Sequence, residues 1–181
     1  MRFIPVPELP EVVVVEPEVF QDDRGFFMEF YHQEKYDEAG IRARFVQDNR
    51  SHSRRGSLRG LHYQIRKPQG KLIWVPSGEV YDVAVDIRRS SATFGKWWGL
   101  TLSDMNRKGL YIPPGFAHGF YVLSERADVF YKCTDFYSRE DERCIRWNDP
   151  ELAIPWPDQE PVLSPKDRTS PFLKEAELPL E

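Results

Sequence analysis

The chain has 181 residues, a length that fits one domain with one core. Apolar residues make up 40% of it and aromatic residues 14%, which is enough for a packed core and excludes a disordered chain. A formal net charge of −4 gives no general attraction to nucleic acid or to an anionic membrane. Two cysteines, Cys133 and Cys144, are too few for a disulfide framework, so we expect a reduced, cytoplasmic setting.

The N-terminal segment shows no targeting or membrane-spanning pattern. Prolines at positions 5, 7 and 10 interrupt it, and they are incompatible with a signal peptide. The longest aliphatic run, residues 12–15, is far too short to cross a bilayer. We therefore expect neither a membrane nor a nucleic acid as partner.

Short segments rich in β-branched and aromatic residues recur along the chain, separated by glycine and proline turn signals. In chain order we predict strands at residues 12–15, 26–30, 44–49, 58–65, 71–75, 80–87, 97–102, 110–112, 118–123 and 129–136. Residues 80–87 alternate clearly between two faces. Many short strands of this kind are typical of an all-β sandwich or small barrel.

Helical signal is scarce. We predict one short helix at residues 33–39, ended by Gly40, and a second short piece near Asp141 or at residues 173–177. From Pro150 onward the chain is rich in proline, which predicts an irregular arm over the barrel.

His62, in the run Arg59-Gly-Leu-His-Tyr-Gln64, is the first candidate for chemistry. On a regular strand it shares a face with Gly60 and Gln64. It fits a general base, although a core histidine bonded to a backbone carbonyl is equally compatible with the pattern. Metal-binding cupins usually have two histidines one residue apart plus a carboxylate. Gln64 stands at the second position here and only His118 could assist, so we expect no metal.

Lys71 and Tyr131 are the next candidates. If Arg66 and Lys71 close a hairpin as a cross-strand pair, His62 and Lys71 face the same side, roughly 13 Å apart on a flat sheet. A bulge in the turn would reverse this, and a solvated lysine is the plain alternative. Tyr131, on the last predicted strand, is either a core tyrosine or a proton donor.

Arginines and amides offer possible contacts to a phosphorylated ligand. The guanidinium groups of Arg24 and Arg59 suit diphosphate oxygens. The run Gln47-Asp-Asn-Arg-Ser51 could hydrogen-bond a base or a sugar. The sequence has no Walker loop and no G-x-G-x-x-G motif, so nucleotide binding would depend on side chains and stacking.

Seven motifs occur in order along the chain, between Val19 and about Arg168, and together they carry a family resemblance. They are Asp23-Arg-Gly-Phe-Phe-Met-Glu29, Gln47-Asp-Asn49, Arg59-Gly-Leu-His-Tyr-Gln64, Pro113-Pro-Gly-Phe-Ala-His-Gly-Phe120, Tyr131-Lys132, Arg146-Trp-Asn-Asp-Pro150 and Leu163-Ser-Pro-Lys-Asp167. In these motifs the chain closely resembles the dTDP-4-dehydrorhamnose 3,5-epimerases, a family of cupin-type dTDP-sugar epimerases. The resemblance implies an all-β, cupin-type jelly roll with a few short peripheral helices.

The resemblance also implies catalytic roles. His62 corresponds to the base, Tyr131 to the proton donor, Asp167 to the partner that orients His62, and Lys71 to the cation beside the enolate oxygen. The ketone of the sugar acidifies C3 and C5 and is itself the electron sink, so no cofactor is expected.

The substrate of the family is a dTDP-4-keto-6-deoxysugar, and the matching contact positions can be named. Arg24 and Arg59 resemble diphosphate or sugar ligands, and Tyr137 resembles the aromatic residue that stacks on thymine. The other matching substrate contacts are Glu29, Gln47, Asp48, Asn49, His118, Glu142 and Lys166, with Asp48 expected to act through its backbone. The family is a homodimer that exchanges N-terminal strands, here about residues 1–30, so Arg24 and Glu29 are expected to serve the other subunit's site.

Four alternatives stay open. Two lie in the same superfamily: an epimerase that inverts only C3 or only C5, and a 3,4-ketoisomerase. A non-catalytic sugar-nucleotide-binding cupin would need no base and acid together. A metal-dependent cupin oxygenase or isomerase would contain stoichiometric metal.

Overall fold

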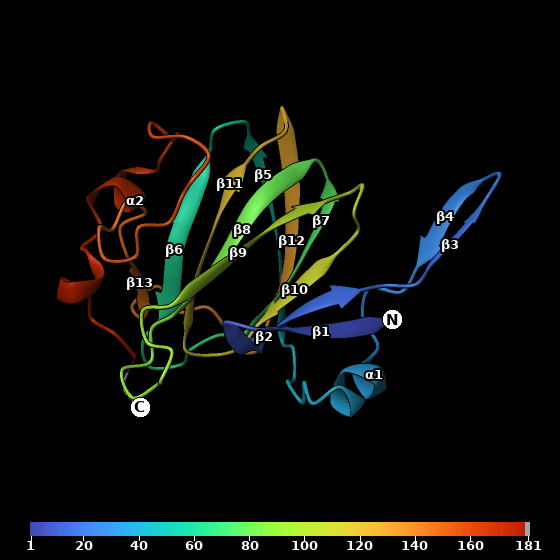
Figure 1. The fold of residues 1–181 in the computed structure, drawn as a ribbon, viewed down its shortest axis with the longest axis horizontal. Helices are drawn as coiled ribbons and strands as arrows, with labels where there is room; N and C mark the ends of the chain where they lie inside the picture. Colours follow the sequence, from blue (N-terminus) through green and yellow to red (C-terminus); the bar gives the residue numbers. More distant parts are fainter. Residues whose placement is uncertain (180–181) are drawn as a thin grey trace.

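Two antiparallel sheets face each other in the structure, a computed structural model that describes residues 1–179 (Figure 1). The strand order is β1-β2-β10-β7-β12-β5 in the six-stranded sheet and β13-β6-β11-β8-β9 in the five-stranded sheet. The sheet strands are β1 (Arg2–Val6), β2 (Leu9–Glu16), β5 (Gln47–Arg54), β6 (Leu58–Gln64), β7 (Lys71–Ser77), β8 (Glu79–Asp86), β9 (Trp97–Ser103), β10 (Gly109–Ile112), β11 (Phe116–Val122), β12 (Arg126–Cys133) and β13 (Glu142–Cys144). The predicted all-β sandwich is confirmed.

Helices are short and peripheral. The predicted helix at residues 33–39 is α1 (Gln33–Glu38), and Gly40 follows it with φ of +86°. The piece expected near residues 173–177 is the 3₁₀ helix η1 (Leu173–Glu175), whereas Asp141 lies in a turn. Helix α2 (Pro165–Thr169) was not predicted. Among residues 1–179, each helix is too short and too polar to cross a bilayer.

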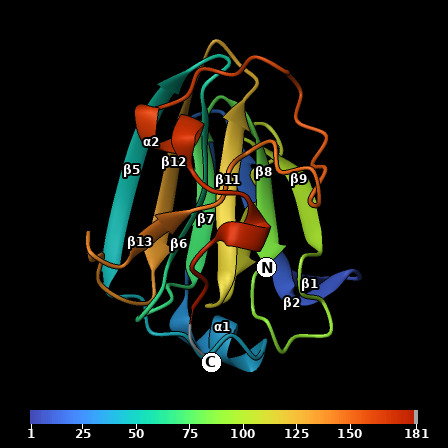
Figure 2. The same ribbon diagram turned by 90° about the vertical axis from the view of Figure 1, so that its left-hand side faces the viewer.

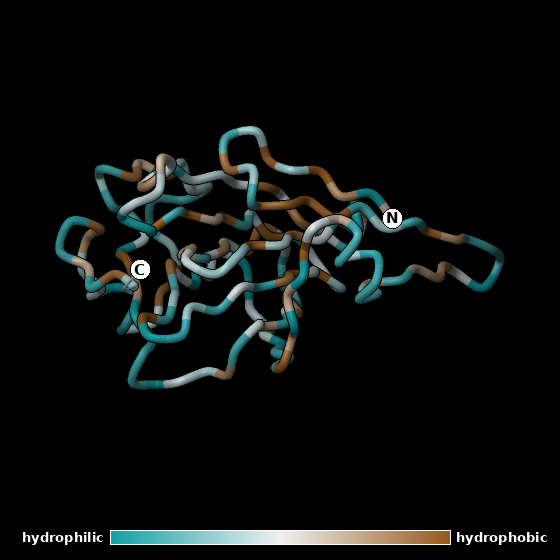
Figure 3. The backbone as a smooth tube through the Cα atoms, turned by 90° about the horizontal axis from the view of Figure 1, so that it is seen from below, coloured by the Kyte–Doolittle hydropathy of each residue, from teal (hydrophilic) through white to brown (hydrophobic). Residues whose placement is uncertain are grey.

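The core between the sheets is aliphatic, and Figure 3 shows hydrophobic segments gathered inside the body with hydrophilic turns around it. The alternation predicted for residues 80–87 is confirmed. Val80 and Ala84 pack into the core between the sheets, whereas Val83 and Val85 pack on the outer face of the five-stranded sheet. Both faces of this central sheet are therefore covered.

The C-terminal segment covers that outer face (Figure 2). Leu152, Ile154 and Trp156 pack there together with Leu173 of η1. Burial of these large side chains holds an otherwise irregular segment against the sheet. As a result, α2 contacts β6, the strand that carries His62.

The predicted hairpin between residues 58–65 and 71–75 is wrong, because the two strands belong to different sheets. β6 pairs with β11 and β13, whereas β7 pairs with β10 and β12. Arg66 bonds to Asp141 instead of pairing with Lys71, and Lys71 lies opposite Cys133 and Ile112. Lys71 therefore approaches His62 across the interior of the sandwich.

β6 also departs from a regular strand. His118 lies opposite His62, and Phe120 lies opposite Arg59. The interval on β11 is therefore two residues where the interval on β6 is three, so β6 contains one extra residue, a β-bulge. Gly60 occupies this bulge with φ of +132°, and a Cβ on it would lie 2.5 Å from the Cα of Gly119. Because of the extra residue, Arg59 and His62 line the same cavity.

Strands β3 (Val19–Asp22) and β4 (Gly25–Met28) form a separate hairpin that projects from the body, at the right of Figure 1. Its aromatic side chains are unusually accessible: Phe20 is 56% exposed, Phe26 53% and Phe27 70%. Contiguous exposed apolar side chains are typical of interaction surfaces, and they are unusual on the body of a monomeric protein.

Candidate active site

A polar pocket of about 180 Å³ is lined by residues of both sheets. His62 of β6, Lys71 of β7 and Tyr131 of β12 all line it, so three of the four predicted catalytic side chains share one cavity. Four of the predicted substrate contacts line the same pocket: Gln47, Asn49, Tyr137 and Glu142. The required juxtaposition of an imidazole and a phenol is therefore present.

A second pocket of about 400 Å³ adjoins the first, since His62 and Glu142 line both. It adds Arg59, Lys166 and Asp167 to the lining. Together the two pockets fall in the size range of small-molecule sites.

His62 and Asp167 form a dyad. The Nε2 atom of His62 lies 2.6 Å from Oδ1 of Asp167, which is only 3% exposed. Burial would raise the pKa of Asp167, but hydrogen bonds from His62 and Ser164 outweigh it and lower that pKa below its ordinary value. A carboxylate can only accept, so Nε2 carries the proton and Nδ1 is left with the free lone pair of a base.

Lys71 and Tyr131 carry the other two predicted roles. Lys71 is buried, and burial lowers its pKa; within residues 1–179 it makes no ion pair shorter than 4 Å. Burial raises the pKa of Tyr131, and its hydroxyl has no hydrogen-bond partner in the described chain. Lys71 thus offers an amine without an ion-pair partner to a ligand, and the raised pKa of Tyr131 favours the protonated phenol.

The predicted contacts around the pocket are linked to one another. The Oε1 atom of Gln47 accepts from the backbone N–H of Tyr137 at 2.9 Å, and its amide donates to Asn49 at 3.0 Å. The Tyr137 hydroxyl donates to Glu142 at 3.0 Å, and Glu142 pairs with Lys166 at 2.7 Å. Tyr137 remains half-exposed, so part of the residue is accessible to a ligand.

Two predicted contacts do not point into the pockets. The Asp48 side chain turns to the opposite face of β5 and pairs with Lys132 at 2.7 Å. His118 is buried, and its Nε2 lies 2.9 Å from both carboxylate oxygens of Asp82. A contact through the Asp48 backbone stays a prediction, as does a substrate contact of His118.

Arg24 and Glu29 lie apart from both pockets. Arg24 is in the turn of the projecting hairpin and pairs with Asp22 at 2.6 Å, and Glu29 pairs with Lys35 at 2.7 Å. Their predicted roles therefore depend on a second subunit, which keeps those roles predictions.

Sequence reasoning missed Cys144, which lies on the unpredicted strand β13 next to the dyad. Its Sγ, a ring nitrogen of His62 and a carboxylate oxygen of Asp167 lie within 4.8 Å of one another, a set that could hold a metal. However, the 2.6 Å separation in the dyad is that of a hydrogen bond, and burial raises the pKa of Cys144 to about 12. The protonated thiol lies 3.6 Å from Asp167 and supports the carboxylate as a weak donor.

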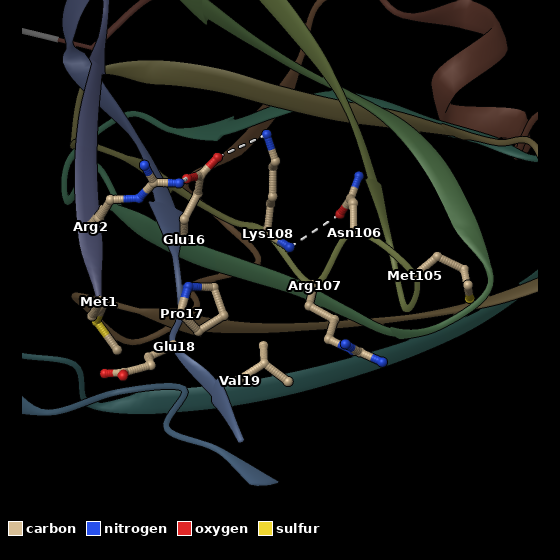
Figure 4. Close-up of a pocket in the computed structure, with 10 residues that line it drawn as sticks. All are labelled: Met1, Arg2, Glu16, Pro17, Glu18, Val19, Met105, Asn106, Arg107 and Lys108. Atoms are coloured by element: carbon tan, nitrogen blue, oxygen red, sulfur yellow. Dashed lines mark hydrogen bonds and ion pairs between the residues drawn. The ribbon is translucent and has the colours of Figure 1, made fainter. Parts of the chain in front are cut away.

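Another pocket, of about 430 Å³, lies at the base of the projecting hairpin (Figure 4). Within it, Glu16 forms ion pairs with both Arg2 and Lys108. None of the predicted site residues lines it. Its lining contains no histidine and no tyrosine.

Comparisons with known proteins agree with this geometry. The sequence matches the family model of dTDP-4-dehydrorhamnose 3,5-epimerase over residues 7–175. The enzyme of that name from Pseudomonas aeruginosa is 58% identical over 171 residues, covering 93% of this chain and 94% of the relative. A solved 3,5-epimerase from Legionella pneumophila, in complex with dTDP-4-keto-L-rhamnose, is 50% identical with a TM-score of 0.95, covering 98% of this chain and 97% of that one.

A more distant relative from Streptomyces niveus bears the name dTDP-4-dehydrorhamnose 3-epimerase and is 40% identical over 164 residues, 90% of this chain and 79% of the relative. Names of single-site and double-site enzymes therefore occur among the relatives. The match to the family model and the identity to the Pseudomonas enzyme both span nearly the whole chain, and the chain belongs to the dTDP-4-dehydrorhamnose 3,5-epimerase family of isomerases.

Proposed function

We propose that this chain epimerises dTDP-4-dehydro-6-deoxy-D-glucose at C3 and C5 to give dTDP-4-dehydro-L-rhamnose, a step of dTDP-L-rhamnose biosynthesis. The observation that carries the proposal is that His62 and Tyr131 line one cavity, with Lys71 between the same two sheets. The Legionella relative, whose complex holds the product of this reaction, supports the assignment of the sugar nucleotide.

The chemistry follows from the protonation states. The C4 ketone acidifies the hydrogen on each flanking carbon, and Nδ1 of His62 removes one of them while Asp167 stabilises the imidazolium. The electron pair left on carbon moves into the ketone as an enolate, which the ammonium of Lys71 stabilises. Tyr131 then delivers its proton to the opposite face of that carbon, which inverts the centre. His62 then loses the abstracted proton to solvent and Tyr131 regains a proton from solvent, so that the same two groups can carry out a second round at the other carbon, with the ketone as the only electron sink.

The remaining residues of the two pockets would hold the nucleotide. In this proposal the ring of Tyr137 stacks on thymine and Arg59 bonds the diphosphate. Lys166 and Glu142 contact the other polar groups of the sugar nucleotide. Gln47 and Asn49 present amides from the inner face of β5. Direct contacts to His118 and to the backbone of Asp48 belong to the same proposal.

A homodimer would complete the site. The projecting hairpin exposes Phe20, Phe26 and Phe27, a surface that a second copy would bury. In the proposed dimer the N-terminal arm, about residues 1–30, crosses to the partner, so that Arg24 and Glu29 reach the partner's pocket. We also assign the enzyme to the cytoplasm, where thiols such as Cys133 and Cys144, both free here, remain reduced.

Turnover of dTDP-4-keto-6-deoxyglucose in heavy water tests the proposal. Deuterium at both C3 and C5 in the product supports it, and deuterium at one carbon identifies a single-site epimerase, as the name of the Streptomyces relative suggests. Migration of the ketone from C4 to C3 identifies a 3,4-ketoisomerase. Full turnover by His62→Ala would refute the assignment of the base.

A further inference from the structure

Both oxygens of the Asp167 carboxylate have a strong partner. Oδ1 faces Nε2 of His62 at 2.6 Å, and Oδ2 accepts from the Ser164 hydroxyl at 2.8 Å. The same hydroxyl oxygen accepts from the backbone N–H of Asp167 at 3.1 Å. Ser164 therefore contacts the acidic member of the dyad twice.

The local sequence explains this arrangement. In Ser164-Pro-Lys-Asp167, serine is the N-cap of α2, Pro165 begins the helix, and Asp167 stands at the third helical position. The Ser164 side chain caps the helix by accepting from the backbone N–H of Asp167, whereas the Asp167 carboxylate bonds His62 and the Ser164 hydroxyl; proline favours the first position because it needs no N–H partner there. The short helix thus fixes the Asp167 backbone relative to the Ser164 side chain.

The second hydrogen bond has a consequence for catalysis. A carboxylate with one partner can rotate about its side-chain bonds, whereas one bonded at both oxygens has a defined orientation. That orientation decides whether Oδ1 accepts from Nε2 of His62, and so whether Nδ1 is the free base. The Ser164 side chain is exposed, and its only proton is donated to Asp167.

We propose that Ser164 is a positioning residue for the epimerisation: it orients Asp167 so that His62 keeps its proton on Nε2 and its lone pair on Nδ1. The inference rests on the proposed function and extends it to a residue with no role of its own in the proton transfers. Ser164→Ala removes the hydroxyl and is expected to lower kcat about 10- to 100-fold, the usual range for groups that orient a reacting histidine, with KM changed by less than about threefold. Ser164→Thr keeps the hydroxyl and is expected to restore most of kcat.

A double-mutant cycle separates positioning from simple helix stability. If Ser164 acts through Asp167, Ser164→Ala costs nothing further in an Asp167→Asn background. Thr169→Ala is the matched control, since Thr169 bonds the Pro165 carbonyl in the same helix at 3.0 Å without touching Asp167. Losses that multiply in the double variant, or an equal loss of kcat in Thr169→Ala, would overturn the proposal.

A proton NMR measurement without substrate distinguishes failure of this inference from failure of the proposed function. The short His62–Asp167 bond should give a downfield imidazole N–H resonance, absent in His62→Asn. It should shift or broaden in Ser164→Ala and persist in Ser164→Thr and Thr169→Ala. An unchanged resonance in Ser164→Ala would show that Asp167 is oriented without Ser164, whatever reaction the enzyme catalyses.

Discussion

Replacing Lys71 by methionine is expected to stabilise the protein while it lowers activity. Lys71 is 9% exposed, and among the described residues it has no ion-pair partner within 4 Å. Burial lowers its pKa, because the charged form is poorly solvated in this position. Methionine has a similar length and flexibility but carries no charge.

The size of the effect follows from the cost of a buried charge. Exchanging buried ionic groups for apolar side chains of similar volume is neutral or stabilising by about 1–4 kcal/mol. For a chain of this length, 1 kcal/mol corresponds to about 2–4 °C in Tm. We therefore expect Lys71→Met to raise Tm by about 2–16 °C. Loss of the cation beside the enolate should lower kcat about 10²- to 10³-fold, as for other groups that stabilise an oxyanion.

Differential scanning calorimetry and deuterium incorporation measure the two effects. Lys67→Met is the matched control, because Lys67 is exposed and the change in net charge is the same. The sign of the pH dependence is also fixed. Because the pKa of Lys71 in the folded protein lies below the ordinary 10.5, the unfolded chain binds the proton more tightly. The destabilisation of the wild-type protein by this buried charge is therefore complete below the folded pKa, and it is lost as pH rises through that pKa. A lower Tm for Lys71→Met, or a Tm advantage that grows towards pH 10, would refute the reasoning.

Three further predictions concern stability and thiol chemistry. Burial would raise the pKa of Asp86, but hydrogen bonds led by Arg88 outweigh it and lower the pKa to about 2, so about 2 kcal/mol of stability should be lost as pH falls from 4 to 2. Urea unfolding at several pH values measures this, and Arg88→Met should lose most of the pH dependence. Gly60→Ala should cost more than about 3 kcal/mol or abolish soluble expression, since its Cβ would overlap the β11 backbone at a positive φ. Cys133 and Cys144 should resist a thiol reagent at pH 8 until urea unfolds the protein, because both are buried and burial raises both pKa values; prompt reaction of the folded protein would contradict this.

The sequence predicted the strands well where a strand carries its own signal. Residues 80–87 alternate between two apolar faces, and β8 follows that pattern. β1 was missed because Pro5 lies within it; as an edge strand of its sheet, β1 tolerates the missing N–H donor. β13 was missed because three residues give no periodicity. Local patterns therefore show which segments are extended, but not which sheet each one joins.

For the site residues too, local patterns show which side chains carry the chemistry but not which of them meet in space. His62 and Tyr131 have chemical signatures within single motifs, whereas their meeting depends on which sheets β6 and β12 join. The dyad joins residues 105 positions apart, and only the family resemblance connected them beforehand. The bulge at Gly60 that brings Arg59 onto the side of His62 depends on close packing against β11, a contact that no local pattern encodes.

Gln64 shows how the cupin sandwich is adapted here. At the position where metal-binding cupins have a second histidine, its Oε1 accepts from the backbone N–H of Ser138 at 2.7 Å, and its amide nitrogen lies 3.5 Å from the carbonyl of Phe136. A carboxamide accepts through its oxygen and donates through its nitrogen, so one side chain can bond a backbone N–H and a backbone carbonyl of the same loop. These two backbone groups flank Tyr137, so Gln64 anchors the loop that carries the proposed thymine-stacking ring. Because a ketosugar is its own electron sink, the proposed reaction does not call on a metal ligand at this position, and the side chain is free to organise substrate binding instead.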